Sequence, residues 1–321
     1  MKKITYFILT ASIFFFSCKK EHTTSSNPSG KKYKVVFNTN FTQKSAAFAL
    51  RRQTNSLQAN DNSEINGNID ILYLYVYDAS SDGFVHRIVQ DSTMSNLGIV
   101  IDSLPAGSYH IYMAAGKKGL IDSGYAANNG LFSGTIGYGS YNWQDIFIGN
   151  IDITVSGSQS DNQIIYLDRQ VTKLELQLID TVPANASTIT LSVYPGYNAT
   201  FIDYRFGGVN PDTSKTTINI PASAIGKAGL TFDKIVLPGN TFDQFNTGLD
   251  IELTSRDASN HVIGTAHVAN VKSPPNERTI LSGKLFPNTV VNSQPPQTFT
   301  VKVDTAWNST PLRQGFSLRT H

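Results

Sequence analysis

The six histidines of this 321-residue chain are the side chains best suited to hold a metal ion, and they are scattered along it. They are His22, His86, His110, His261, His267 and His321. His261 and His267 share one face of an expected strand, but six residues at about 3.3 Å each separate them by roughly 20 Å. Asp78, Asp82 and Gly83 lack the bidentate acid of a calcium loop and are typical of a hairpin turn. We therefore expect no metal site.

Residues for covalent or acid–base catalysis do not form a recognisable pattern either. The chain has no HExxH, GxSxG or Walker motif, and no GxGxxG lies between a strand and a helix. A single cysteine, Cys18, excludes disulfides, cysteine zinc sites and iron–sulfur clusters. The sequence predicts a protein that is not an enzyme and that needs no cofactor.

Cys18 follows a short apolar leader. A start with two lysines precedes an apolar run over residues 4–16, which is followed at once by Ser17 and the cysteine. The run is shorter than the about 20 residues that span a bilayer, and its layout is typical of a secretory signal. Residues 15–18 resemble a bacterial lipobox, in which cleavage precedes a cysteine that carries lipid. We expect residues 1–17 to be a signal peptide and Cys18 to be lipidated, for example with palmitate; the alternative is a secreted protein with an incidental cysteine.

The residues behind Cys18 predict a flexible tether over residues 18–32. Residues 19–32 contain no aliphatic or aromatic side chain, so they cannot contribute to a core. Without the two leader lysines, 26 − 2 = 24 basic residues balance 24 acidic ones. A net charge of zero leaves no electrostatic surface for nucleic acid.

From Tyr33 onward the apolar residues recur with a period of two, which is typical of half-buried strands. The segment IDILYLYVYD, residues 69–78, is apolar on both faces and predicts a central strand. In KLELQLID, residues 173–180, leucines alternate with polar residues, so we expect Leu174, Leu176 and Leu178 inward and Glu175 and Gln177 outward.

Helical candidates are short, with residues 46–53 and 222–229 spanning about two turns each. Many short strands separated by turn residues predict an all-β chain of two β-sandwich domains. We place the first domain at residues 33–165 and the second at residues 166–321.

The segment from residue 116 to residue 143 is rich in Gly, Asn, Ser and Tyr and has weak periodicity. A connection of this length is typical of a functional loop or of a crossing between sheets. Its rings, Tyr125, Tyr138, Tyr141 and Trp143, are candidates for contacts with a partner protein or a glycan. They could equally close the end of the first sandwich, and the residues alone favour this packing role.

Several stretches, taken in order, resemble the Bacteroidales fimbrillin and fimbrial anchor lipoproteins, the FimB-like family. They are the lipobox, IDILYLYVYD with its DG turn, LPAGSYHIYMAA (104–115), DIFIG (145–149), YLDRQVTKLELQL (166–178), RTILSGKLF (278–286) and TFTVKVDTAW (298–307). In YLDRQVTKLELQL, Arg169 precedes the expected first strand of the second domain.

The resemblance implies two transthyretin-like sandwiches behind a lipoprotein signal peptide. It also implies an outer-membrane location facing the cell exterior, with fimbrial subunits as partners that join by exchange of β-strands. Arg51 and Arg52 resemble the arginine cleavage site of polymerising fimbrillins, although an arginine pair in a polar loop is more often simply solvated.

We therefore expect a fimbrial anchor or minor fimbrial subunit. The candidate strand for exchange is residues 298–307, in which Phe299, Val301 and Val303 alternate with polar residues. The alternative is a surface glycan-binding lipoprotein of a polysaccharide-utilisation system, which would use the aromatic segment from Tyr125 to Trp143.

The leader generates a first prediction. Cys18→Ala should release the protein from membranes or block its processing, because no other apolar segment is long enough to hold it. Metabolic labelling with a fatty acid should mark the wild-type protein and leave the variant unlabelled. Equal labelling of the two proteins would contradict lipidation at Cys18.

Overall fold

The computed structural model describes most of the chain from Gly30 onward. The described residues are 30–41, 68–128, 131–138, 143–156, 161–194, 197–201, 206–209, 215–238, 248–286, 299–304 and 319–320. From Lys32 onward the described chain is one compact unit, so the predicted boundary between residues 165 and 166 stays a prediction. No helix in the described ranges has the length and apolar character needed to cross a membrane.

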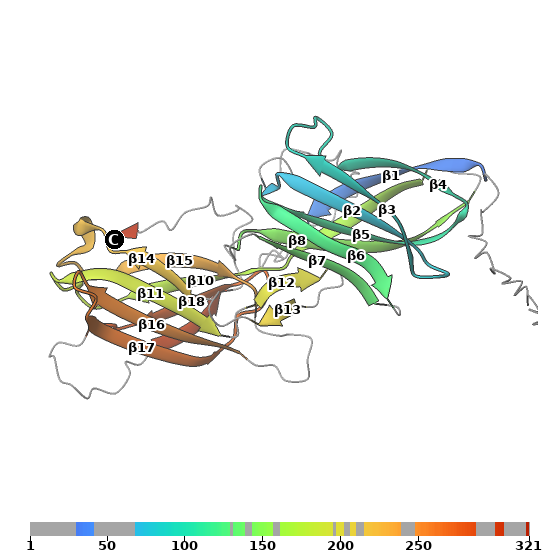
Figure 1. Cartoon of the computed structure of the whole chain (residues 1–321). Helices are drawn as coiled ribbons and strands as arrows, with labels where there is room; N and C mark the ends of the chain where they lie inside the picture. Colours follow the sequence, from blue (N-terminus) through green and yellow to red (C-terminus); the bar gives the residue numbers. More distant parts are fainter. Residues whose placement is uncertain are drawn as a thin grey trace, which may run out of the picture. The chain divides into compact units, whose positions relative to one another are not determined.

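The fold is all-β, as the sequence predicts (Figure 1). The strands of the first half are β1 (Lys32–Phe41), β2 (Ile71–Asp78), β3 (Gly83–Asp91), β4 (Ile99–Pro105), β5 (Gly107–Gly116), β6 (Leu120–Asn128), β7 (Leu131–Tyr138), β8 (Ile146–Val155) and β9 (Asp161–Arg169). Those of the second half are β10 (Thr172–Leu178), β11 (Ala186–Tyr194), β12 (Tyr197–Phe201), β13 (Phe206–Val209), β14 (Lys215–Asn219), β15 (Leu230–Val236), β16 (Leu249–Asp257), β17 (Val262–Val271), β18 (Arg278–Gly283), β19 (Phe299–Asp304) and β20 (Arg319–Thr320).

Of the two helical candidates, the one over residues 222–229 is wrong, and the other is not tested. Residues 222–229 contain only the single 3-10 turn η3 (Ala222–Ala224), which has no side-chain cap and is followed by glycines at positive φ. Residues 46–53 lie outside the described residues.

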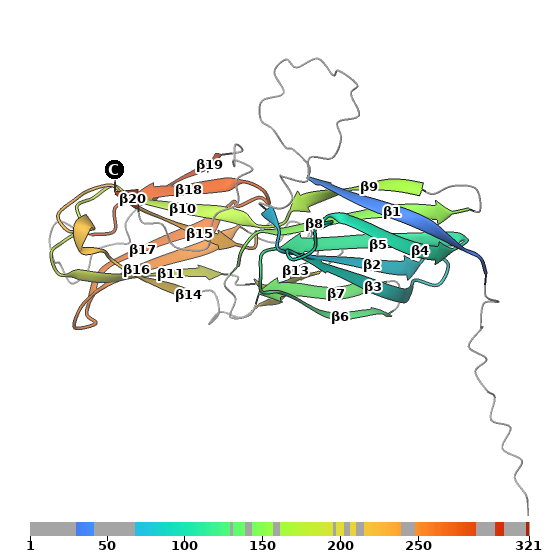
Figure 2. The ribbon, with the colours of Figure 1, turned by 90° about the horizontal axis from the view of Figure 1, so that it is seen from above.

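A seven-stranded sheet in the order β3-β2-β5-β8-β9-β1-β4 contains all strands of the first half except β6 and β7 (Figure 2). Strands β8 and β9 pair only at two positions, Phe147 with Arg169 and Ile148 with Asp168. The sheet can therefore turn at this join, and β9, β1 and β4 pack over the remaining strands. One core cluster lies between the two layers, with Val35 and Phe37 of β1 buried alongside residues of β2, β5 and β8.

Strand β2 is buried on both faces, which confirms the predicted central strand. Its even-numbered residues, Leu72, Leu74 and Val76, belong to the core cluster between the layers. Its odd-numbered residues are Ile71 and three tyrosines, and they belong to or pack against a second cluster on the opposite face. Strands β3 and β5 flank β2 and complete its backbone pairing.

The second half is a sandwich of two sheets that share one core. A five-stranded sheet has the order β19-β18-β10-β15-β20, and a four-stranded sheet has the order β14-β11-β16-β17. As predicted, Leu174, Leu176 and Leu178 face the core between them and are fully buried. Glu175 and Gln177 lie on the other face but are only half-exposed, because Arg278 binds the Glu175 carboxylate there.

A further four-stranded sheet, in the order β13-β12-β7-β6, combines strands from both halves of the chain. Strand β12 pairs with β7 through Thr200 opposite Ile136 and Phe201 opposite Thr135. The hairpin of β6 and β7 comes from the aromatic segment of the sequence, so this segment connects the halves by backbone pairing as well as by side chains.

The alternating leucines of β10 generate a second prediction. Leu176→Ala should lower the free energy of unfolding by about 2–5 kcal/mol, because it leaves a cavity in the second core. Its neighbour Gln177 is the matched control: Gln177→Ala removes one hydrogen bond to Glu175 and should cost about 1 kcal/mol or less. Urea denaturation followed by tryptophan fluorescence measures both, and equal losses would contradict the assigned faces.

Candidate assembly site at the junction and the sheet edges

A buried ion pair lies where the first half of the chain passes into the second. Arg169 ends β9, and its Nε is 2.8 Å from Oδ1 of Asp145, which directly precedes β8. The two side chains are only 5% and 1% exposed. The guanidinium also lies 5.1 Å from the centre of the Phe147 ring and donates from Nη1 to the Asn276 side chain at 3.3 Å. Arg169 thus contacts residues of both halves.

Burial sets the electrostatics of this pair. Removal from water raises the pKa of Asp145 and lowers the pKa of Arg169, and the attraction between the two charges opposes both shifts. A charge left without its partner in this position would be strongly unfavourable. Replacing either Asp145 or Arg169 would therefore leave the charge of the other buried without its partner.

The backbone on either side of Arg169 is held in the same way. The Gln170 N–H donates to the Ile146 carbonyl at 2.8 Å, which ties the connection to β8. The Asn276 N–H donates to the Val171 carbonyl at 2.9 Å, which ties it to the second half. Asn276 adopts a positive φ of 60°, a conformation that asparagine tolerates better than most residues. The connection from β9 to β10 is a fixed segment rather than a free linker.

An apolar cluster covers the tyrosine face of β2 at this junction. Its buried members are Tyr73, Tyr75, Tyr77, Ala114, Leu120, Trp143, Ile146, Ile148, Val171 and Leu237. The Tyr73 hydroxyl donates to the Leu120 carbonyl at 2.9 Å, and the Tyr75 hydroxyl donates to Asp122 at 3.0 Å. Strand β6 therefore provides acceptors for the hydroxyls of Tyr73 and Tyr75, which explains how these two tyrosines can fill a buried face.

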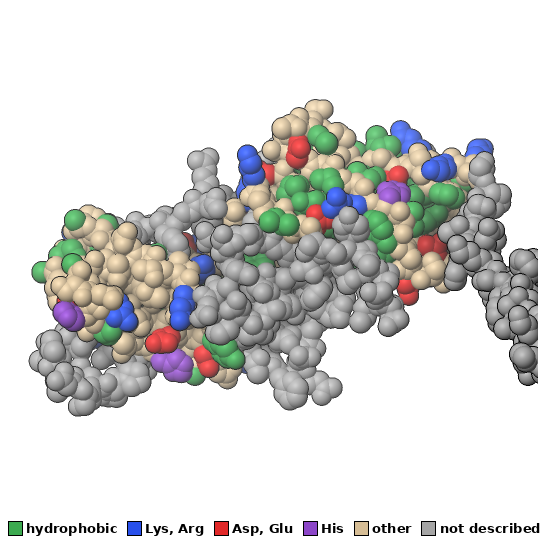
Figure 3. Space-filling view, viewed as in Figure 1, with side chains coloured by type: hydrophobic (Ala, Val, Ile, Leu, Met, Phe, Trp, Pro, Cys, Tyr) green, Lys and Arg blue, Asp and Glu red, His purple; other side chains and the backbone are tan. Residues whose placement is uncertain are grey.

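The two outer strands of the seven-stranded sheet are linked by their side chains. His86 of β3 lies 2.8 Å, Nε2 to Oδ2, from Asp102 of β4. Burial opposes ionisation of Asp102, but hydrogen bonds from His86 and from the Ser103 N–H outweigh it and lower the pKa of this carboxyl. Figure 3 shows hydrophobic side chains at the surface of this half, where Val85 and Val89 of β3 are exposed.

The predicted exchange strand is part of its own sheet over residues 299–304. Strand β19 pairs antiparallel with β18 along its whole length. The Phe299 ring is buried and lies over Gly283, where a Cβ atom would come within 2.6 Å of it. Val301, predicted to share the inward face, is 40% exposed, because β19 is the outermost strand and has no neighbour on its other side in the described chain.

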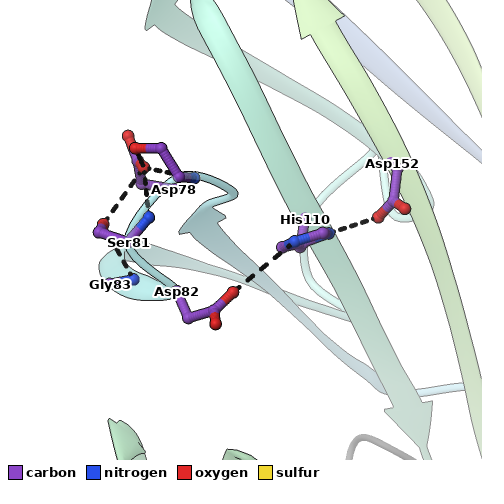
Figure 4. A network of polar contacts seen from close by, with 7 residues as sticks. Asp78, Ser81, Asp82, Gly83, His110 and Asp152 are labelled. Atoms are coloured by element: carbon purple, nitrogen blue, oxygen red, sulfur yellow. Dashed lines mark hydrogen bonds and ion pairs between the residues drawn. The ribbon is translucent and has the colours of Figure 1, made fainter. Parts of the chain in front are cut away.

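The acidic turn between β2 and β3 has the hairpin role that the sequence predicts (Figure 4). The Asp78 carboxylate accepts hydrogen bonds from the Ser80 and Ser81 N–H groups at 2.9 and 3.1 Å, and bonds from Ser80 and Ser81 lower its pKa. His110 lies between Asp82, 3.8 Å away, and Asp152, 2.6 Å away. These three side chains are not arranged to hold a metal ion, and no other group of His, Cys, Asp or Glu in the part of the chain that the structure describes is.

The structure describes only some of the candidate contact residues. Cys18, Arg51, Arg52 and Tyr141 lie outside the described residues. Tyr125 is in β6 and Tyr138 is in β7, so the two belong to one hairpin. Trp143 is only 9% exposed and packs in the junction cluster. This burial fits the packing role, and a contact between the segment and a partner or glycan stays a prediction.

Sequence reasoning missed Asp145 as a site residue and identified Arg169 only through the family resemblance. The two residues are 24 positions apart, and no periodic pattern connects them. Asp145 is a lone charge directly before the apolar start of β8, which is a weak signal of a buried charge, whereas Arg169 follows Asp168 and does not stand out in the same way.

Comparisons with known proteins agree with this architecture. The family model described as fimbrillin-A associated anchor proteins Mfa1 and Mfa2 matches residues 46–307. The fold is similar to the fimbrial anchor protein Mfa2 from Porphyromonas gingivalis, with 10% identity, coverage of 85% of this chain and 98% of that chain, and a TM-score of 0.51. No curated protein matches the chain in sequence.

Two structures from Bacteroides thetaiotaomicron are also similar. One is a proposed adhesin, with 12% identity, coverage of 89% of this chain and 99% of that chain, and a TM-score of 0.51. The other is described among proposed polysaccharide-binding proteins, with 9% identity, 78% and 92% coverage, and a TM-score of 0.50. At these identities the structural likeness shows the fold alone.

The junction pair generates a third prediction. Asp145→Asn should lower the free energy of unfolding by about 3–5 kcal/mol, because it leaves the Arg169 charge buried without its partner. Asp152 is the matched control: its carboxylate also contacts a cation-forming side chain but is 80% exposed, so Asp152→Asn should cost about 0.5 kcal/mol or less. Similar midpoints for both variants in urea denaturation would contradict a structural role for the pair.

Proposed function

Because the chain belongs to the family of fimbrillin-A associated anchor proteins Mfa1 and Mfa2, we propose that it is a lipid-anchored outer-membrane protein that holds a fimbria at its base or contributes a minor subunit. Family membership itself gives a fimbrial or adhesive role at the cell surface or envelope, without catalysis. The match over residues 46–307 is the observation that carries the proposal.

Lipid at Cys18 would supply the attachment. Acyl chains contribute about 0.8 kcal/mol per buried CH₂, so an N-terminal cysteine carrying several chains is held on a membrane essentially permanently. The polar residues up to Lys32 would then let the folded part stand away from the headgroups. This arrangement suits an anchor, since a fibre must be held by something that does not dissociate.

Strand exchange would supply the contact with the next subunit. An outermost strand presents unpaired N–H and C=O groups, and an added extended strand satisfies them while its alternate side chains fill a core. Phe299 of β19 is already buried in its own sandwich, so giving β19 away would expose the second core. We propose instead that the five-stranded sheet accepts a strand from its partner.

Deletion of the gene tests the proposed function. Fimbrial protein should move from the cells to the culture medium, because fibres without an anchor are released. Complementation with the wild-type gene should restore retention, whereas the Cys18→Ala gene should not. The measurement is the ratio of fimbrial protein on cells to that in the medium, together with fibre length by electron microscopy.

Unchanged retention and fibre length would overturn the anchor function. If the purified protein were then retarded in gels that contain polysaccharide, the glycan-binding alternative would take its place.

A further inference from the structure

One edge of the five-stranded sheet is only partly covered. Strand β15 pairs with β10 along its full length, from Leu230 opposite Leu178 to Val236 opposite Thr172. On its other side, β20 pairs with Leu230 and Thr231 alone. Within the described ranges, residues 232–236 have no strand on that side, so their outward backbone groups are available for pairing.

A lysine lies on the core-facing side of this edge. Lys234 is opposite Leu174 in the antiparallel pairing, and opposite residues share a face of the sheet. Leu174 is fully buried, and Phe232 and Val236, on either side of Lys234 along that face, are also in the core. Lys234 therefore points the same way as the leucines of β10.

The charge of Lys234 is not balanced by a described acid. Its neighbour Lys173 on β10 forms an ion pair with Asp233 at 2.8 Å on the outer face, but no acidic side chain in the described part of the chain lies within ion-pair distance of Lys234. Burial lowers the pKa of Lys234 to about 8. An ammonium in this position favours an added carboxylate.

An inward charge on an outer strand controls what can pair with it. A purely apolar strand laid along β15 would bury the Lys234 ammonium without a partner, which is unfavourable. A strand with an aspartate or glutamate at that register would form an ion pair as it adds. The same side chain thus opposes non-specific association and favours one kind of strand.

We propose that residues 232–236 of β15 accept one extended strand of a fimbrial subunit, and that Lys234 selects a strand that places a carboxylate opposite it. The proposal rests on the proposed function and names the accepting edge. The occupant is an acidic strand because charge complementarity at Lys234 requires it. Strand β20 pairs antiparallel at the Leu230 end, so the added strand occupies the remaining length of β15 toward Val236.

Other described edges are less suited to this role. His86 and Asp102 link β3 to β4 across the first half. At β17 the Leu285 carbonyl oxygen lies so close to Gly264 that a Cβ there would be 2.3 Å away, so this edge is already approached by backbone. On strand β19, Lys302 is exposed and points to solvent rather than to the core, so this edge has no inward charge that could select a partner strand.

The test uses full-length lipoprotein in cells that make the fimbria. The variants are Lys234→Glu, which would repel the partner carboxylate, and Lys234→Met, which removes the charge but keeps the length of the side chain. Lys302→Glu makes the same charge change on the outer strand at the opposite edge of the sheet and is the matched control. The readout is the amount of fimbrial subunit that co-purifies with the detergent-solubilised anchor.

We expect Lys234→Glu to reduce co-purified subunit about tenfold or more, Lys234→Met to reduce it less, and Lys302→Glu to leave it unchanged. Thermal unfolding identifies variants that do not fold, and Lys234→Met keeps the test valid if Lys234→Glu is one of them. Normal capture by either folded Lys234 variant overturns the proposal. If gene deletion releases fibres while these variants capture normally, only the accepting edge is wrong, and the anchor function stands.

A photo-reactive phenylalanine analogue in place of Asp233, on the outer face of β15, identifies the occupant directly. A cross-link to an acidic segment of a fimbrial subunit, located by mass spectrometry, supports the proposal. A cross-link only to residues 305–321 of the same chain, or to a second copy of it, overturns the proposal.

Discussion

The need to cover both faces of β2 organises much of this structure. One face carries leucines and valine, which a second layer of strands can bury in the usual way. The other face carries three tyrosines, whose rings require an apolar cover and whose hydroxyls require acceptors. Strand β6 supplies apolar cover from Leu120 and acceptors for the hydroxyls of Tyr73 and Tyr75, and Val171 and Leu237 from the second half add to the cover. Strand β2, like its sheet neighbours β5 and β8, thereby contributes to both clusters.

The polar groups of the junction also connect the two halves of the chain, but through hydrogen bonds and an ion pair rather than through apolar contacts. Apolar contacts alone do not fix direction, whereas the Arg169 fork and the backbone bonds of Gln170 and Asn276 have defined geometry. A buried ion pair contributes little net stability compared with apolar residues of similar volume. What the pair does here is hold the end of β9 against the residue that precedes β8.

Local periodicity predicted the strands whose faces have contrasting chemistry. The two-sided β2 and the alternating leucines of β10 follow from residue type alone, because successive side chains of a strand point to opposite faces of its sheet. Pairings between distant segments were out of reach: nothing in the sequence near Thr200 indicates that β12 pairs with β7. Val301 shows a related limit, since its parity predicts an inward position but its exposure depends on β19 being outermost. The sequence does show Lys234 between Phe232 and Val236. That its side chain faces the core at a sheet edge became clear only from its pairing with Leu174.

The parallel pairing of β1 with β9 has a mechanical consequence. Val35 is opposite Asp161 at one end of the pair and Phe41 is opposite Leu167 at the other. A force that enters at Lys32 and leaves through Arg169 pulls the two strands from opposite ends, so they are sheared past one another. In shear, all hydrogen bonds of the ladder resist together, whereas a force applied at one shared end would peel them apart singly. The order of strands in this sheet thus suits a protein that is pulled along its chain axis.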